Sequence, residues 1–303
     1  MYSDQDFKFI DKCDICGCKK NRLFYISDAW GSDAAASNTF KKKVSVVQCQ
    51  NCGFVYAKEI LSESGKKKFW ESYSTNVHQA VQEDVDKRKK MYELEYNFIN
   101  NFLLMKENND ILDIGCADGS FLDFFAKNNN CYGVEIGKDA LFKARQKYFV
   151  YEGELPNIKI DKKFDLIILR GVIQYIDNPK QYFDKVIELL SSDGLLYITS
   201  TPNVDSFAHT LFREYFNLPV CAVAGKGFSP AILNRLFQNK DMCLVGEKYF
   251  YENTPYANVY SDIQKVMAAL ELKKNGKEIN FKAPAFWGNM MSLVYKKVKG
   301  KIR

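Results

Sequence analysis

A short stretch near the middle of the chain, residues 110–135, limits the possible fold more than any other part of the sequence. It begins with an apolar run, Asp110 to Ile114, and passes through a loop that contains Gly115 and Gly119. It then reaches a second apolar run that ends at Glu135. Glycines in such a loop let the backbone pass close to a ligand, and the N–H groups at the start of a helix favour negative charge. The stretch therefore predicts a strand, a ligand-binding glycine loop, a helix and a second strand parallel to the first.

The alternation of apolar runs and helical spacing continues along the chain. Further strands are predicted at residues 148–151, 164–169, 195–200, 243–251 and 289–297. Helices are predicted at residues 81–105, 120–127, 139–147, 181–190, 205–215 and 259–273. Strands that alternate with helices favour a parallel sheet covered on both faces, so we predict an α/β fold with a doubly wound, seven-stranded, Rossmann-like sheet.

The spacing of the acid after the glycine loop bears on the ligand. Glu135 stands 22 residues after Asp113. An acid about 20 residues past a glycine loop accepts hydrogen bonds from ribose hydroxyls, which predicts an adenosine-containing ligand. A nicotinamide dinucleotide competes with this interpretation. Against the dinucleotide, the loop has Gly-x-x-x-Gly spacing, and Asp113 precedes it, where a carboxylate would repel a pyrophosphate.

Five of the nine cysteines lie within the first 52 residues. Two Cys-x-x-Cys-Gly motifs, Cys13 to Gly17 and Cys49 to Gly53, have 32 residues between Cys16 and Cys49. Each motif can direct two thiolates at one ion, and four thiolates make a closed, tetrahedral, structural zinc site. We therefore predict zinc bound by Cys13, Cys16, Cys49 and Cys52. The alternatives are Cys18 in place of Cys16, an iron–sulfur site, and four thiols without metal.

Charge and composition bear on the class of protein. The longest uncharged stretch, Val44 to Ala57, is 14 residues, which is too short to cross a bilayer, and Asp4 and Asp6 do not fit a signal peptide. We therefore expect a cytoplasmic protein whose cysteines serve metal binding or packing. The net charge of +6 lies at the two ends, because residues 76–292 hold 26 basic and 28 acidic residues. This middle part argues against a long phosphate-binding track.

From Asp110 to Asn203 the chain resembles the class I S-adenosylmethionine-dependent methyltransferases. The likeness rests on ILDIGCADGSF, YGVEI, FDLIILRGVIQYIDNP and DGLLYITSTPN, which follow one another in the expected order. The resemblance implies that the glycine loop surrounds the methionine part of the cofactor, that Glu135 binds the ribose, and that the segment ending at Leu155 meets the adenine. The middle glycine of the loop is replaced by Ala117, which is small enough for binding to survive. The expected cofactor contacts are Asp113, Gly115, Ala117, Gly119, Glu135, Ile136, Glu154, Leu155 and Arg170.

The cysteine motifs ahead of this region are similar to a subgroup that methylates sugars and other small metabolites in bacterial glycan and natural-product pathways. The resemblance implies a zinc-ribbon domain over residues 1–75 and a methyltransferase domain over residues 76–303, with residues 201–240 facing the substrate. The expected acceptor is an oxygen or carbon of a sugar or sugar-nucleotide. The alternatives are an RNA methyltransferase, with the lysine runs at 41–43 and 66–68 on phosphate, and a silent scaffold. The sequence sets no oligomeric state.

The candidates for the chemistry are few, because the chain has only two histidines. A neutral hydroxyl acceptor usually needs a general base, most often histidine. His209 is expected on the polar side of the predicted helix at 205–215, and His78 at the domain junction. Tyr175 is a third candidate; it follows Gln174, where many relatives carry Glu-His, and Ala224 stands where a histidine is frequent. If no base is used, an acceptor that is already anionic could be held by the charge of Arg170.

Overall fold

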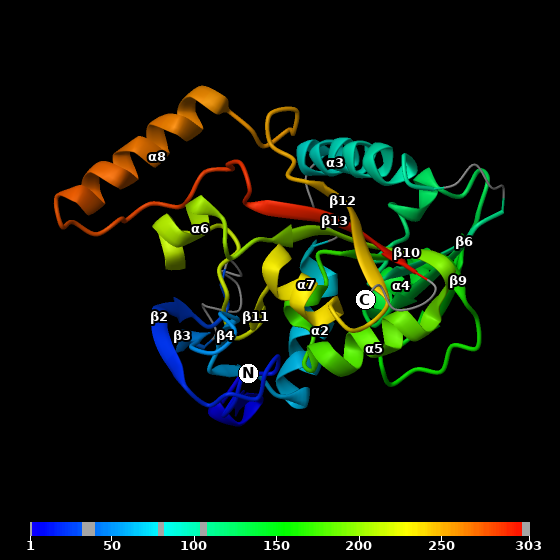
Figure 1. Cartoon of the computed structure of the whole chain (residues 1–303), viewed down its shortest axis with the longest axis horizontal. Coiled ribbons are helices and arrows are strands. Elements are labelled where there is room, and N and C mark those ends of the chain that lie inside the picture. Colours follow the sequence, from blue (N-terminus) through cyan, green and yellow to red (C-terminus); the bar gives the residue numbers. More distant parts are fainter. Residues whose placement is uncertain (1, 32–39, 78–81, 104–107, 299–303) are drawn as a thin grey trace.

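The computed structural model describes residues 2–31, 40–77, 82–103 and 108–298 of the chain. Seven strands form the main sheet in the order β12-β13-β10-β9-β6-β7-β8 (Figure 1). Five neighbouring strands are parallel: β8 (Phe149–Glu152), β7 (Asn130–Glu135), β6 (Asp110–Ile114), β9 (Phe164–Arg170) and β10 (Leu190–Pro202). The antiparallel end consists of β13 (Met290–Lys297), which pairs with β10, and the edge strand β12 (Met242–Lys248). The predicted seven-stranded α/β sheet is confirmed.

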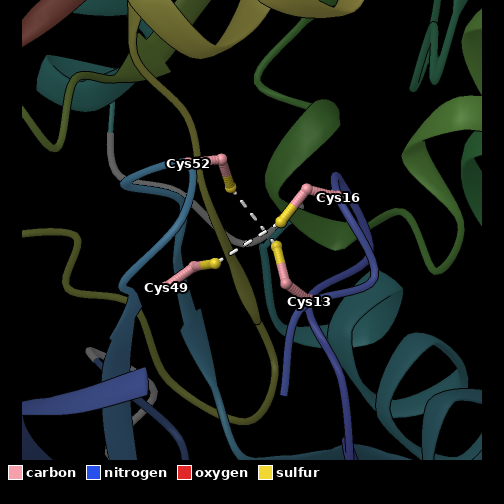
Figure 2. Close-up of side chains that lie close together, drawn as sticks. All are labelled: Cys13, Cys16, Cys49 and Cys52. Carbon is pink, nitrogen blue, oxygen red and sulfur yellow. Dashed lines mark hydrogen bonds between the residues drawn. The ribbon is translucent and has the colours of Figure 1, made fainter. Parts of the chain in front are cut away.

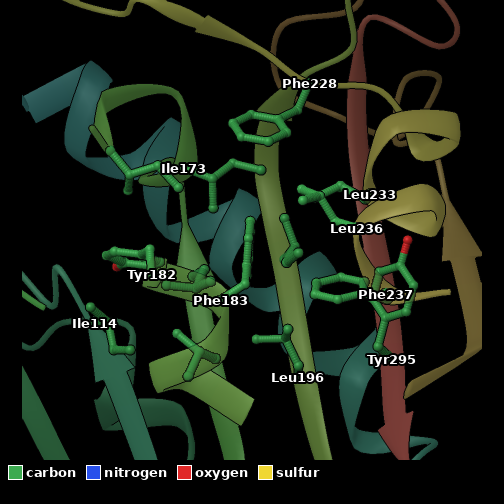
Figure 3. Packing of buried hydrophobic residues seen from close by; sticks show 14 of the residues in the cluster. Ile114, Ile173, Tyr182, Phe183, Leu196, Phe228, Leu233, Leu236, Phe237 and Tyr295 are labelled. Carbon is green, nitrogen blue, oxygen red and sulfur yellow. The ribbon is translucent and has the colours of Figure 1, made fainter. Parts of the chain in front are cut away.

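Helices cover both faces of this sheet. Side chains of a strand alternate between the faces, and Leu112 and Leu196 lie in one apolar layer while Ile111 and Tyr197 lie in the other. Figure 3 shows the first layer, where Phe183 packs beside the strands. The helices of that layer are α5 (Pro179–Leu189) and α7 (Pro230–Phe237), and those of the other are α3 (Gln82–Asn100) and α4 (Lys138–Ala144). Among the described residues, none of the helices combines the length and apolar character that crossing a bilayer requires.

The N-terminal part of the chain forms a small sheet in the order β11-β4-β3-β2. Its strands are β2 (Asn21–Asp28), β3 (Lys43–Cys49), β4 (Val55–Ala57) and β11 (Lys226–Gly227). We call the described residues from 2 to 61 the ribbon. We call the described residues from 62 onward the body. Because β11 belongs to the connection after β10, the body completes the ribbon sheet, and Val204 and Val220 share an apolar cluster with Val44 and Val46.

Two further pieces connect the ribbon to the body. A helical turn, η1 (Asp4–Asp6), precedes the strand pair β1 (Phe7–Phe9) and β5 (Glu59–Leu61). The helix α2 (Glu63–Val77) then leads from the ribbon toward the carboxyl ends of the main strands and packs on η1 and α4. Figure 1 shows the ribbon in blue beside α6 (Phe207–Phe212).

Two predicted helices are shorter in the structure than the sequence indicates. The helix expected at residues 120–127 is one turn of 3₁₀ helix, η2 (Leu122–Phe124). The helix expected at residues 205–215 is divided into α6 and a 3₁₀ turn, η4 (Arg213–Tyr215), because Arg213 has a φ of 51°. A residue in that left-handed region cannot continue an α-helix. By contrast, α8 (Val259–Lys274) nearly matches its predicted range, and Asn258 caps its first turn.

Candidate functional site

A cavity of about 400 Å³ lies at the carboxyl ends of β6, β7 and β9. This is where ligands bind in open α/β sheets, because the loops of neighbouring parallel strands diverge there. Eight of the nine predicted cofactor contacts line it: Asp113, Gly115, Ala117, Glu135, Ile136, Glu154, Leu155 and Arg170. Gly119 is the exception. It has a φ of 80°, and a Cβ at this position would lie 2.9 Å from Cδ2 of Tyr148, so this glycine serves the packing of the loop.

The loop after β6 holds an unusual backbone that its sequence explains in part. Gly115 has a φ of 77°, and a Cβ there would lie 2.8 Å from a methyl group of Val172. Ala117 has a φ of 49°, although it carries a Cβ. Left-handed backbone costs a non-glycine residue about 1 kcal/mol, so the alanine at this position strains the loop without breaking it.

Glu135 connects the end of β7 to this loop. One carboxylate oxygen accepts hydrogen bonds from the N–H groups of Ile136 and Gly137, at 2.8 and 2.7 Å. The other accepts from the N–H of Ala117, at 2.9 Å. These three N–H donors hold the side chain in one orientation at the cavity wall. The carboxylate is therefore fixed in place before any ligand arrives.

Asp113 is the most unusual charge of the cavity. Its carboxyl group is buried, and among the described residues Oδ1 has no hydrogen-bond partner. Burial raises the pKa of Asp113 to about 7, and the negative charges of Glu135 and Glu95 act in the same direction against the opposing charge of Arg170. A buried carboxylate without a partner is costly unless a cation or a donor approaches it. This wall of the cavity suits a positively charged ligand.

Arg170 forms an ion pair with Glu95, a residue that the sequence analysis did not identify. Its Nε donates to the carboxylate of Glu95 on α3 at 2.6 Å, and its guanidinium lies 4.6 Å from the ring centre of Tyr92. Glu95 is buried and also accepts from the hydroxyl of Thr199 at 3.0 Å. The charge of Arg170 is thus balanced by Glu95, which weakens the interpretation that Arg170 holds an anionic acceptor.

The three catalytic candidates have different outcomes. Tyr175 lies on η3 (Ile173–Tyr175) and lines the cavity, where its ring centre is 5.2 Å from that of Trp70. His78 lies outside the described residues. His209 does not line the cavity, and the solvent-facing position predicted for it is wrong, because its side chain is fully buried against the ribbon. Its Nε2 lies 3.3 Å from the hydroxyl of Tyr25.

The burial of His209 has a consequence for stability. Burial lowers the pKa of His209 to about 4 in the folded protein, so the unfolded chain binds a proton more readily between pH 6.5 and pH 4. The wild-type protein therefore loses stability as the pH falls through this window, by up to about 3 kcal/mol from this residue. We expect His209→Gln, which cannot titrate, to regain about 2.5 kcal/mol relative to wild type between pH 7 and pH 4.5. Urea unfolding of both proteins at the two pH values measures it, and a constant difference would contradict a depressed pKa.

The four cysteines of the two motifs converge in the structure. Figure 2 shows their sulfurs facing one another, and all four lie within 4.8 Å of each other. The Sγ atoms of Cys13 and Cys52 are 3.5 Å apart, as are those of Cys16 and Cys49. Cys18 does not belong to this group. The two motif glycines have positive φ angles of 74° and 80°, which lets their N–H groups turn back to the carbonyls of Cys13 and Cys49.

Residues 74–282 match the profile of a methyltransferase domain family. The chain belongs to this family. It carries a methyltransferase domain, and the resemblance noted in the sequence for residues 110–203 is confirmed at the level of this domain.

Relatives of this methyltransferase share only part of their length with it. It is 25% identical to (S)-tetrahydroprotoberberine N-methyltransferase of Eschscholzia californica over 126 residues, which are 37% of this chain and 33% of that one. It is 31% identical to the ubiquinone biosynthesis O-methyltransferase of Glaesserella parasuis over 115 residues, 33% of this chain and 48% of that one. These matches span between a third and a half of the relatives.

A solved structure shares the fold of this methyltransferase at low sequence identity. It is a chain in the complex between the Haloferax volcanii Trm112 methyltransferase activator and a methyltransferase. The TM-score is 0.55 and the sequence identity is 9%. The likeness covers 76% of this chain and 98% of that chain. It extends the shared architecture beyond the region that the sequence relatives match.

Proposed function

We propose that this methyltransferase transfers the methyl group of S-adenosylmethionine to a small molecule, an oxygen or carbon of a sugar or sugar-nucleotide in glycan biosynthesis. The observation that favours a small acceptor over RNA is the ion pairing of the lysines at residues 41–43 and 66–68. Three of their six lysines are in ion pairs within the protein: Lys42 with Asp4 and Glu59, Lys66 with Asp177, and Lys68 with Asp6. These ion pairs occupy half of the lysines in the two runs and so reduce the charge available for phosphates, which disfavours RNA as the substrate. The cysteine motifs support the sugar-type acceptor through their resemblance.

The cavity residues fit the cofactor. S-adenosylmethionine supplies an electrophilic methyl group on a positively charged sulfur. The unpartnered oxygen of Asp113 fits its cationic methionine part, and the fixed carboxylate of Glu135 fits the ribose hydroxyls. Glu154 and Leu155 lie on the wall assigned to the adenine. Gly115 and Ala117 line the same cavity, and the small size of these two residues would let a ligand come close to the backbone of the loop.

We also propose that Cys13, Cys16, Cys49 and Cys52 bind a structural zinc ion. Zinc bonds to sulfur at about 2.3 Å, and a tetrahedron of that size separates its sulfurs by about 3.8 Å. The Sγ–Sγ distances of 3.5 Å in the pairs Cys13–Cys52 and Cys16–Cys49 are close to this value. A disulfide would bring two sulfurs to about 2.05 Å, which neither pair approaches. Four cysteine ligands leave no open position, so the ion would fold the ribbon and take no part in methyl transfer.

A methyl-transfer assay tests the proposed acceptor. We expect the purified protein to transfer radiolabelled methyl groups from S-adenosylmethionine to at least one hexose in a panel of UDP-, GDP- and dTDP-linked sugars. Total bacterial RNA serves as the competing substrate, and we expect no incorporation into it at any salt concentration. Transfer to RNA that falls steeply between 50 and 200 mM salt would contradict the proposal and favour a phosphate-binding ribbon.

A further inference from the structure

A second pocket, of about 130 Å³, lies where the ribbon, α2 and the connection from β10 to β11 meet. It shares one residue, Tyr175, with the cofactor cavity. Two consecutive residues of α2 face the two spaces: Phe69 lines the small pocket and Trp70 lines the cofactor cavity. The rings of Trp70 and Tyr175 are in edge-to-face contact, so these aromatic side chains form the partition between the two spaces.

The walls of the small pocket are aromatic or aliphatic, with little net charge. Trp30 of the ribbon lines it, and its indole N–H donates to the carbonyl of Phe40 at 2.6 Å, which fixes the ring. Lys226 also lines the pocket, but its ammonium group is buried and paired with Asp14 of the ribbon. An aromatic wall together with a neutralised cation suits an uncharged ring better than an ionic group.

Gln174 supplies the polar feature of this pocket. The residue is 8% exposed. Its Nε2 donates to the carbonyl of Gly171 at 3.0 Å, which defines the orientation of the amide. Its Oε1 is buried and has no hydrogen-bond partner among the described residues. Buried amide oxygens are rarely left without a donor, so this atom indicates a ligand that brings one.

We propose that this pocket binds the ring that accepts the methyl group, and that Oε1 of Gln174 positions it by accepting a hydrogen bond from a ring hydroxyl or amine. The ligand class is an uncharged ring with hydrogen-bond donors, such as the hexose of a sugar-nucleotide. Its apolar face would stack on Trp30 or Phe69, and its reacting atom would face the cofactor cavity beside Tyr175. This inference rests on the proposed function, since it assigns the acceptor of that reaction to a place and a residue.

The pocket also gives the ribbon a role in acceptor binding. Asp14 lies between Cys13 and Cys16, the two cysteines of the first motif. Its ion pair with Lys226 connects that motif to a wall of the pocket. The cysteine centre therefore supports the acceptor site through one buried ion pair, without contacting the acceptor.

Two variants test the assignment with the sugar-nucleotide panel as the probe. Ala224 is half-buried in the pocket wall, and Ala224→Trp would fill the space. We expect it to lower kcat/KM for the methylated panel member by at least about twenty-fold, because the bulky side chain excludes the ring. We expect Gln174→Met, which removes the acceptor atom at similar volume, to raise KM for the sugar about ten-fold. Neither variant should change the Kd for S-adenosylmethionine.

Ala126→Trp is the matched control for the filling variant, because Ala126 is exposed and lines neither space. Normal turnover by Ala224→Trp and Gln174→Met would overturn the pocket assignment and leave the proposed function intact. A wild-type protein that binds S-adenosylmethionine but methylates no member of the panel would overturn both the sugar-type acceptor and this use of the pocket. Loss of cofactor binding in Gln174→Met would place that residue at the cofactor and also contradict the inference.

Discussion

Replacing Cys49 with serine should lower the melting temperature of this protein by about 10 °C or more and abolish binding of the proposed zinc ion. Cys49 is buried at the end of β3 and belongs to the same apolar cluster as Phe54 and Tyr56. A serine there leaves a polar hydroxyl in the cluster and only three thiolates for the ion. Because β3 pairs with β4 and β4 pairs with β11 of the body, the loss should spread into the body. Differential scanning calorimetry and zinc analysis by mass spectrometry measure the two effects.

The control for this variant is Cys243→Ser, which changes a partly exposed cysteine outside the four-cysteine group. We expect it to keep one zinc per chain and to shift the melting temperature by less than about 2 °C. A Cys49→Ser protein that retains a full equivalent of zinc, or a wild-type protein purified with none after expression in zinc-supplemented medium, would contradict the proposed metal centre.

The main sheet could be predicted because each of its buried strands is recognisable from its own residues. Buried parallel strands are continuous apolar runs, and residues 164–169 and 195–200 contain them almost without interruption. The glycine loop and Glu135 likewise allowed the residues on the cofactor side of the site to be predicted. The spacing along one strand–loop–strand unit fixes which residues meet at the strand ends. These features depend on local sequence, so the structure brings them together as expected.

The features that could not be predicted depend on contacts between segments that are far apart in the sequence. Helical spacing placed His209 on a polar face, but the ribbon covers that face, with Tyr25 against the imidazole. Strand β11 has only two residues and pairs with β4, which lies far away in the sequence. Glu95 gave a weaker signal that could have been used: it shares a helix face with Tyr92 and Ile99, and an acid among apolar neighbours requires a buried partner.

Asp113→Asn should weaken the binding of S-adenosylmethionine about a hundred-fold, because the variant keeps the shape of the side chain and removes its charge. The wild-type affinity should also depend on pH. With a pKa of about 7 in the free protein, Asp113 is mostly protonated at pH 6 and mostly ionised at pH 8. A cationic ligand binds the ionised form, so the affinity should rise about ten-fold from pH 6 to pH 8. Isothermal titration calorimetry at several pH values measures both effects.

The pH dependence separates a role in ligand binding from a role in folding. If Asp113 contacts the cation, the rise in affinity should disappear in Asp113→Asn and persist in Asp205→Asn, where the same change is made at an exposed acid away from the cavity. If Asp113 only supports the loop, its variant should lose affinity equally at every pH, and the ten-fold rise should remain. A wild-type affinity that falls from pH 6 to pH 8 would reverse the sign of the argument and exclude an ionised Asp113 as the group that holds the positive charge.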